Sequence, residues 1–209
     1  MKRDEELQRY WDKQAGTFDR QMSTFDRYFA RDTREWICAR ATGRILEVAI
    51  GTGLNLPHYP ADADLTGIEW SAEMLAHARR KAAERGLKAD LRQGDAQALE
   101  YEDDTFDSVV CTFSLCSIPD DRQAVVEMVR VLRPGGLLLL ADHVESSNWA
   151  IRAGQWLTEI VTIRTAGEYW RRRPIRHVEA LGLSIVEHDR FRAGTIERLA
   201  AQKFKTNSR

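Results

Sequence analysis

Cysteine is scarce in this chain, with three residues among 209. Cys38, Cys111 and Cys116 follow neither the spacing of a disulfide framework nor that of a zinc site, so we expect reduced thiols. Long hydrophobic runs are also missing, because the longest, Gly135 to Ala141, is far shorter than the roughly 20 residues of a spanning helix. The first six positions are too acidic for a signal peptide. We therefore predict a cytoplasmic protein without a transmembrane segment.

The sequence lacks an excess of charge of either sign. Its 31 basic and 32 acidic residues give a formal net charge of -1, so no overall field would attract nucleic acid, and we predict no such partner. The one dense charge run, Arg171–Arg173, is expected to be a solvated helix start. The length and the 43% hydrophobic content favour a single globular domain.

The period of the apolar residues changes along the chain. Residues 4–40 have helical spacing, which predicts two helices with a hinge near Gly16. From Ile45 to Ile50 a short apolar run leads into glycines, as a buried parallel strand would. Further strands alternate with helices, which indicates a parallel α/β sheet. These strands are predicted at residues 65–69, 89–92, 106–112, 137–143 and 183–189.

The loop after the first strand predicts a ligand site. A strand followed by glycines and a helix presents backbone N–H groups at the carboxyl edge of the sheet, where nucleotide-like cofactors bind. The sequence Gly51-Thr52-Gly53-Leu54-Asn55-Leu56 has Leu56 where dinucleotide folds place a third glycine. An NAD-dependent dehydrogenase is therefore disfavoured, although it remains an alternative.

The segment from Glu47 to Gly53 resembles motif I of the class I S-adenosylmethionine-dependent methyltransferases, with Ala49 where that family usually has glycine. Glu69 ends the second strand, where the family binds the ribose hydroxyls, and Asp95 lies in a turn similar to the adenine-binding one. Taken singly, these acids could also be a loop cap, a surface acid and a turn residue. The motifs at 106–110 and 131–136 match as well.

The resemblance spans about residues 40–145 and implies the cofactor S-adenosylmethionine, with S-adenosylhomocysteine as product. It implies a doubly wound, mostly parallel sheet of seven strands. From the residue pattern we expect one domain with a helical cap at 1–40, a cofactor-binding core at 41–145, a helical insertion at 146–182 as substrate lid and C-terminal strands at 183–209. No metal is expected. The predicted cofactor-binding residues are Tyr10, Phe18, Glu47, Ala49, Gly51, Thr52, Gly53, Glu69, Trp70, Met74, Gly94, Asp95, Ala96, Thr112 and Phe113.

Methyl transfer requires mainly an aligned nucleophile and the exclusion of water, so few catalytic residues are needed. His143 is the candidate, because it stands at the carboxyl end of the fifth strand, where cofactor and substrate would meet. A neutral imidazole there could accept the acceptor's proton, or His143 could simply pack. Cys111 and Cys116 are interpreted as small hydrophobic residues.

Residues 110–118 resemble a subgroup that contains alkyl-thiol methyltransferases and phosphatidylethanolamine N-methyltransferase-like proteins. This implies a small, lipophilic acceptor, with a thiol favoured; N-methylation of phosphatidylethanolamine and O- or C-methylation of a metabolite are alternatives. The aromatic N-terminal helices with Trp149, Trp156 and Trp170 could line its pocket or form core. A catalytically inactive binding module also stays open, as do peripheral membrane contact and the oligomeric state.

Overall fold

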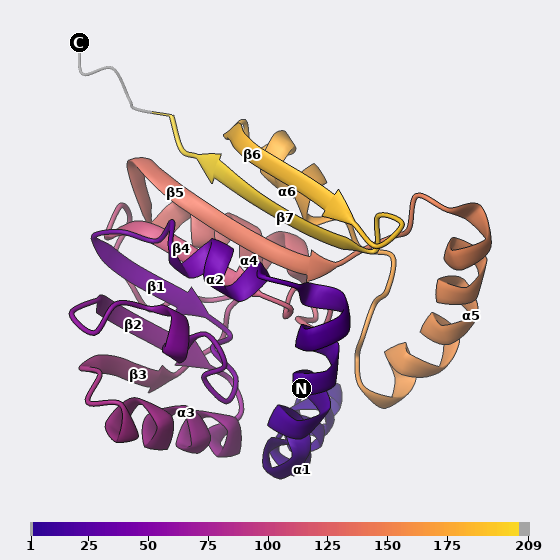
Figure 1. Ribbon diagram of the computed structural model, residues 1–209, viewed down its shortest axis with the longest axis horizontal. Coiled ribbons are helices and arrows are strands. Elements are labelled where there is room, and N and C mark those ends of the chain that lie inside the picture. Colours follow the sequence, from indigo (N-terminus) through magenta and orange to yellow (C-terminus); the bar gives the residue numbers. More distant parts are fainter. Residues whose placement is uncertain (1, 205–209) are drawn as a thin grey trace.

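The computed structural model describes residues 2–204, which contain one seven-stranded sheet in the order β3-β2-β1-β4-β5-β7-β6. The first five strands are parallel, and β7 runs antiparallel to both β5 and β6. Figure 1 shows the parallel strands pointing toward the N-terminal helix. The strands are β1 (Arg44–Val48), β2 (Asp64–Glu69), β3 (Ala89–Gln93), β4 (Phe106–Thr112), β5 (Leu132–His143), β6 (Ser184–Phe191) and β7 (Ile196–Gln202).

Helices lie on both faces of this sheet (Figure 1). Alternate residues of a strand point to opposite faces, so the central strands contribute to two separate hydrophobic cores. On β4, Val109 joins the core under α4 and α6, whereas Val110 joins the core under α2 and α3. The helices and helical turns are α1 (Lys2–Phe25), η1 (Asp26–Ala30), α2 (Thr33–Cys38), η2 (Leu56–His58), α3 (Ala72–Glu84), α4 (Asp121–Val131), α5 (Trp149–Thr165) and α6 (Pro174–Ala180).

The sequence located six of the strands to within a few residues, and the mostly parallel α/β sheet is confirmed. Ser71 caps α3 by accepting a hydrogen bond from the Met74 backbone N–H, and Gly86 follows the helix with a φ of 67°. The seventh strand, β7, lies within the predicted C-terminal part of the chain. Positions 205–209 of that part lie outside the described residues.

The predicted hinge near Gly16 is wrong. Helix α1 continues through Gly16, which is exposed and has open space where a side chain would stand. The chain changes direction later, at the π-helical turn η1, after which Arg31 takes a φ of 55°. A glycine on the solvent side of a long helix lowers the stability of the helix without ending it, because its low helix propensity is the only unfavourable effect there.

Helix α5 stands at the edge of the molecule, away from the sheet (Figure 1). Its buried side chains are Gln155 and Glu159, while most of its large apolar residues are exposed. Within residues 2–204, no helix combines the length and the apolar character that crossing a bilayer requires.

We predict that Gly16→Ala stabilises the protein, because α1 is continuous there and alanine costs less backbone entropy in a helix. The expected gain is about 0.5–1 kcal/mol in urea or thermal unfolding. The matched variant Gly53→Ala should destabilise, since Gly53 has a φ of 81° and its Cβ would lie 2.5 Å from Leu56 Cδ1. A loss of stability in Gly16→Ala would contradict an uninterrupted α1.

Candidate functional site

A cavity of about 300 Å³ lies at the carboxyl ends of the parallel strands, beneath α1. Open α/β sheets bind their ligands at this edge. The chain continues from β1 to β2 on one side and from the neighbouring strand β4 to β5 on the other, so the strand order reverses between β1 and β4. The volume is in the lower range of small-molecule sites. Its walls are formed by Trp11, Phe18, Gln21, Met22, Phe25, Ala49, Gly51, Ile68, Glu69, Trp70, Met74, Gly94, Asp95, Ala96, Gln97, Phe113, Ser114, Cys116, Ser117, Ile118, Pro119, His143, Glu168 and Trp170.

The loop after β1 turns through left-handed backbone conformations. Ala49 and Gly51 have φ values of 54° and 59° and line the cavity. A Cβ placed on Gly51 would meet nothing within 4 Å, so the space in front of this loop is open to a ligand. Gly53 instead faces Leu56 and the backbone of α3, which explains why a side chain is excluded there. The first glycine leaves room for a ligand, and the second allows the loop to pack.

The carboxylate of Glu69 joins two parts of the site. One oxygen accepts the backbone N–H of Gly51 at 2.9 Å, and the other accepts that of Ser71 at 2.8 Å. Burial raises the pKa of Glu69, while the N–H groups of Ser71 and Gly51 act in the opposite direction. Each carboxylate oxygen has a second lone pair, so Glu69 can accept further hydrogen bonds from a ligand in the cavity.

A buried polar network supports the loop from beneath. Asn55 donates from Nδ2 to Glu47 Oε1 and to Thr112 Oγ1, both at 3.0 Å, and its Oδ1 accepts from Arg34 Nη1 at 3.0 Å. Burial raises the pKa of Glu47 to about 7. Glu47 and Thr112 therefore lie behind the loop, outside the residues that line the cavity.

Helix α1 covers the cavity and is attached by its acidic residues. Asp12 accepts a hydrogen bond from Ser71 Oγ at 2.5 Å. Seven residues later, Asp19 accepts one from Thr52 Oγ1 at 2.5 Å and pairs with Lys81 at 2.6 Å. A spacing of seven places both carboxylates on the same face of a helix, toward the glycine loop and α3. Sequence reasoning missed these contacts; the seven-residue spacing of the acids is the signal that could have found them.

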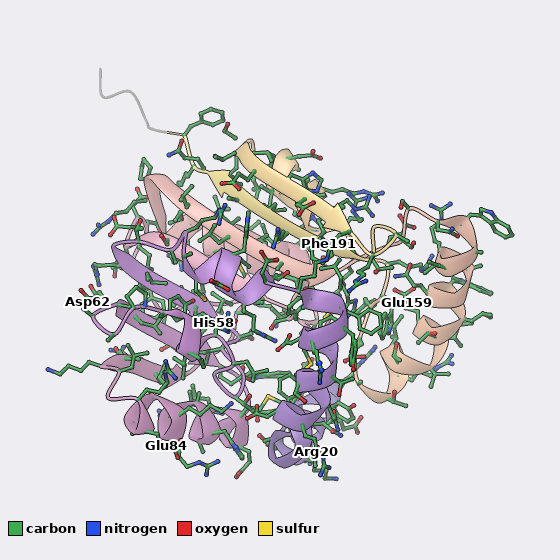
Figure 2. The ribbon with its side chains drawn as sticks, viewed as in Figure 1. Arg20, His58, Asp62, Glu84, Glu159 and Phe191 are labelled. Carbon is green, nitrogen blue, oxygen red and sulfur yellow. The ribbon has the colours of Figure 1, made fainter. Side chains whose placement is uncertain are left out.

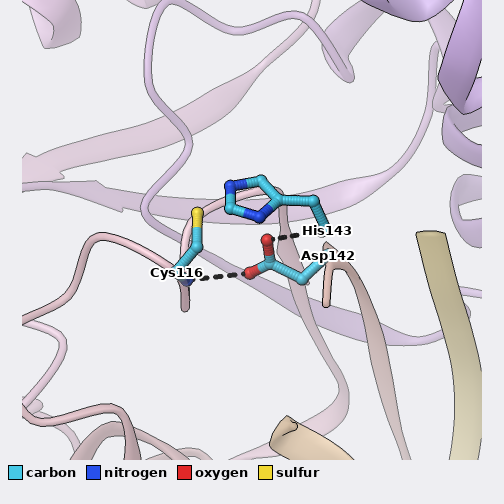
Figure 3. A group of neighbouring side chains, drawn as sticks. All are labelled: Cys116, Asp142 and His143. Atoms are coloured by element: carbon cyan, nitrogen blue, oxygen red, sulfur yellow. Dashed lines mark hydrogen bonds between the residues drawn. The ribbon is translucent and has the colours of Figure 1, made fainter. Parts of the chain in front are cut away.

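At the opposite wall, His143 stacks on Trp170 with ring centroids 4.5 Å apart. Burial lowers the pKa of His143 to about 4, so its imidazole is neutral at pH 7. Figure 3 shows Asp142 accepting the backbone N–H groups of His143 and Cys116, at 2.8 and 3.0 Å. Burial raises the pKa of Asp142 to about 7 and that of the Cys116 thiol well above its usual value.

His143 Nδ1 is buried and has no hydrogen-bond partner among residues 2–204. A buried imidazole nitrogen without a partner is costly unless something else satisfies it. Because His143 lines the cavity, a bound molecule could supply that partner.

The arginine run is not the solvated segment that the sequence predicts. Arg172 donates to the backbone oxygens of residues 115, 118 and 119, and its guanidinium lies 3.4 Å from Asp121. Arg173 pairs with buried Glu197, and Arg171 pairs with buried Glu159. Both Arg172 and Arg173 are largely buried, because each finds a carboxylate or carbonyl partner inside the fold. Arg172 fixes the loop that forms one wall of the cavity.

The structure brings eleven of the sixteen predicted site residues to the cavity. These are Phe18, Ala49, Gly51, Glu69, Trp70, Met74, Gly94, Asp95, Ala96, Phe113 and His143. Five others do not line it: Tyr10, Glu47, Thr52, Gly53 and Thr112. Of the aromatic residues proposed for a pocket, Trp170 contributes, whereas Trp149 and Trp156 are exposed on α5. Gln21, Glu168 and the loop at 114–119 were not predicted as site residues.

The polar groups of the cavity fit a nucleoside with a charged tail. Glu69 and Asp95 lie on one side of Gly51, at the ends of β2 and β3, where a sugar and a base would stand. Asp95 is oriented by its own turn, since its Oδ1 accepts the Gln97 backbone N–H at 2.9 Å. The open space before Gly51 accommodates the remainder of such a molecule.

Comparison with known families and proteins agrees with this geometry. The family described as a methyltransferase domain matches residues 46–140. The chain is 46% identical over 115 residues to a phosphatidylethanolamine N-methyltransferase of Cereibacter sphaeroides, which covers 54% of this chain and 56% of the relative. It is 40% identical over 106 residues to a demethylmenaquinone methyltransferase of Thermus thermophilus, covering 49% of this chain and 48% of the relative. The chain thus spans about half the length of these curated relatives.

Solved structures support the same fold. An S-adenosylmethionine-dependent methyltransferase from Thermotoga maritima superposes with a TM-score of 0.69 at 18% identity. The superposition covers 93% of this chain and 99% of the other. At this identity the likeness concerns the fold.

We predict that Glu47→Gln removes a pH dependence of stability. The folded state keeps a proton on Glu47 up to about pH 7, whereas the unfolded chain releases it near 4.5. Stability from this group is therefore full below about pH 4.5 and is lost as the pH rises to about 7. In urea unfolding, the free energy of unfolding of the variant relative to wild type should increase by on the order of 1–3 kcal/mol from pH 5 to pH 8.

The exposed Glu84→Gln on α3 is the control and should follow wild type at both pH values. If Glu47→Gln also follows wild type, the carboxyl is ionised in the folded protein.

Proposed function

We propose that this chain, whose residues 46–140 match a methyltransferase domain, is an S-adenosylmethionine-dependent methyltransferase that methylates a lipophilic acceptor in the cavity beneath α1. The observation that carries the proposal is the position of Glu69, Asp95 and Gly51 on one wall and of His143 on another wall of the same cavity. The cofactor S-adenosylmethionine, when bound, supplies an electrophilic methyl group.

The cofactor end of the cavity is polar. The carboxylate of Glu69 accepts hydrogen bonds from the ribose hydroxyls, and Asp95 accepts one from the exocyclic amine of adenine. Met74 and Ile68 border the same part of the cavity with apolar surface. The open side of the Gly51 turn would receive the amino-acid tail.

The acceptor end combines apolar walls with two polar groups. Phe18, Met22 and Phe25 of α1 exclude water, which favours an alkyl or acyl chain. The neutral imidazole of His143 lacks a partner at Nδ1, so it can position the acceptor or take its proton as the new bond forms. Its stacking on Trp170 fixes the ring plane, which restricts the direction of that contact.

Among acceptors, we favour an amine over the thiol that the sequence suggested. Glu168 lines the cavity, and burial raises the pKa of its carboxyl, so an ammonium bound beside it would stabilise the ionised acid and could pass its proton to that acid, which frees the amine lone pair for attack on the methyl group. A neutral thiol would offer that carboxylate only a weak S–H hydrogen bond. The names of two relatives, which refer to phosphatidylethanolamine and demethylmenaquinone, also support an amphiphilic acceptor.

We expect Glu69→Gln and Asp95→Ala each to weaken the binding of S-adenosylhomocysteine by about 1–3 kcal/mol, because Glu69→Gln replaces one acceptor oxygen by an amide donor and Asp95→Ala removes the acceptor. Isothermal titration calorimetry measures the loss. Glu84→Gln, on the exposed side of α3, should bind as wild type does. Unchanged affinity in both cavity variants would remove these ribose and adenine assignments, and absent binding in wild type would refute the proposed function.

We expect His143→Ala to lower kcat by about 10²–10⁴-fold with an amine acceptor, the usual contribution of a positioned acid or base. The affinity for S-adenosylhomocysteine should stay within a factor of two or so, because His143 acts in the chemical step. Initial rates with labelled cofactor, using an alkylamine and an alkanethiol of equal chain length, make the measurement. Equal turnover in variant and wild type would make His143 a packing residue, and faster methylation of the thiol would reverse the acceptor preference.

A further inference from the structure

Helix α5 packs on the rest of the chain through polar side chains. Gln155 accepts the backbone N–H of Ser146 at 2.8 Å and donates to the backbone oxygens of Val144 and Trp170. One turn later, Glu159 is 5% exposed and pairs with Arg171 at 2.6 Å. Figure 2 labels Glu159 on the side of α5 that faces the rest of the chain. The polar side of this helix is therefore its inner side.

The outer side of α5 is apolar. Its large exposed residues include Trp149 at 75%, Leu157 at 60% and Val161 at 60% exposure, together with Trp156 and Ile160. With about 100° per residue, these five positions and two alanines fall within one continuous arc of the helix surface, which Arg164 enters in the last turn. A surface helix of a globular protein usually turns its apolar stripe toward the core. In α5 the apolar stripe faces outward and the polar side faces the protein. So large a contiguous apolar surface indicates an interaction site.

The exposed charges of α5 are all basic. Arg152 and Arg164 are exposed, whereas the single acid of the helix, Glu159, is buried and already paired. The turn beside its N-terminus adds exposed Arg192, because the Ser147 backbone N–H donates to the Ala193 oxygen there. Two tryptophans, aliphatic residues and basic flanks without a free acid are the composition of helices that lie in the interface of an anionic bilayer.

We propose that the outer face of α5, defined by Trp149, Trp156, Leu157, Ile160 and Val161, docks the protein on an anionic lipid surface. The indoles and aliphatic chains enter the boundary between headgroups and acyl chains, while Arg152 and Arg164 contact lipid phosphates. Among the possible occupants of this face, an anionic lipid surface is favoured, because the basic residues of the face complement anionic headgroups. The proposal goes beyond methyl transfer, because it rests on the surface of α5 alone.

The position of α5 relates this surface to the cavity. The chain leaves α5 at Thr165 and within five residues reaches Glu168 and Trp170, which line the cavity. Helix α1 is attached at the same place, because Arg3 donates to the Ile163 backbone oxygen at 3.2 Å. Docking through α5 thus holds the acceptor end of the cavity close to the lipid surface.

Sedimentation with vesicles tests the proposal on the full chain without cofactor. Wild type should sediment with vesicles of phosphatidylcholine and phosphatidylglycerol, and binding should weaken at high salt and on phosphatidylcholine alone. Trp156→Glu/Leu157→Glu should lower the apparent partition coefficient at least about tenfold, because two buried apolar contacts become charges. The variant Arg152→Gln/Arg164→Gln should lose most of the salt-dependent part of vesicle binding.

Val186→Glu is the matched control, since Val186 is a 55% exposed apolar residue on β6 and its variant should sediment as wild type does. All four proteins should bind S-adenosylhomocysteine equally, which shows that they fold and keeps this test separate from that of the proposed function. Wild type that ignores anionic vesicles, or a Trp156→Glu/Leu157→Glu variant that binds them normally, overturns the proposal. So does light scattering that finds a wild-type dimer dissociated by the same substitutions without any vesicle binding.

Discussion

The site depends on one bridging carboxylate. Glu69, at the end of β2, accepts one backbone N–H from the loop after β1 and another from the first turn region of α3. These two segments leave the sheet from neighbouring strands, and without a common acceptor their N–H groups would be buried without partners. The two hydrogen bonds of Glu69 also set the distance between the glycine turn and the residues that follow β2. Local folding and the ligand recognition proposed for this site therefore share one side chain.

Much of this arrangement could be predicted from the sequence, because it depends on local patterns. A short apolar run that ends in Gly51 and Gly53 specifies a buried strand and a turn, and in a parallel sheet the ends of successive strands meet at one edge. His143 was placed there by that rule, and Glu69 and Asp95 by the rule together with their resemblance to family motifs; all three line the cavity. Capping at Ser71 was equally local.

The remaining features depend on tertiary contacts. Glu47 and Thr112 occupy strand ends, as the cavity residues do, yet they meet Asn55 behind the loop because alternate residues face opposite sides. The attachment of α1 through Asp12 and Asp19 joins residues more than thirty positions apart. The seven-residue spacing places both acids on one face of the helix, but it does not identify the residues that they bind. For α5, a helical segment was predicted at 146–182, but the sequence does not say which side of the helix meets the protein. Buried Gln155 and Glu159 decide that.

The attachment of α1 also sets how the molecule can open. Its connections to the glycine loop and α3 are hydrogen bonds and an ion pair, groups that water can satisfy when they separate. The sheet beneath is held by two apolar cores, which have no such substitute. Buried Leu7 and Ala15 and the contact of the Phe25 and Phe113 rings add an apolar attachment of α1, and η1 is the place where the chain turns after this helix. Since α1 covers the cavity, a nucleoside bound there as proposed would leave only when these contacts open, and the rate of that opening would then set an upper limit on turnover.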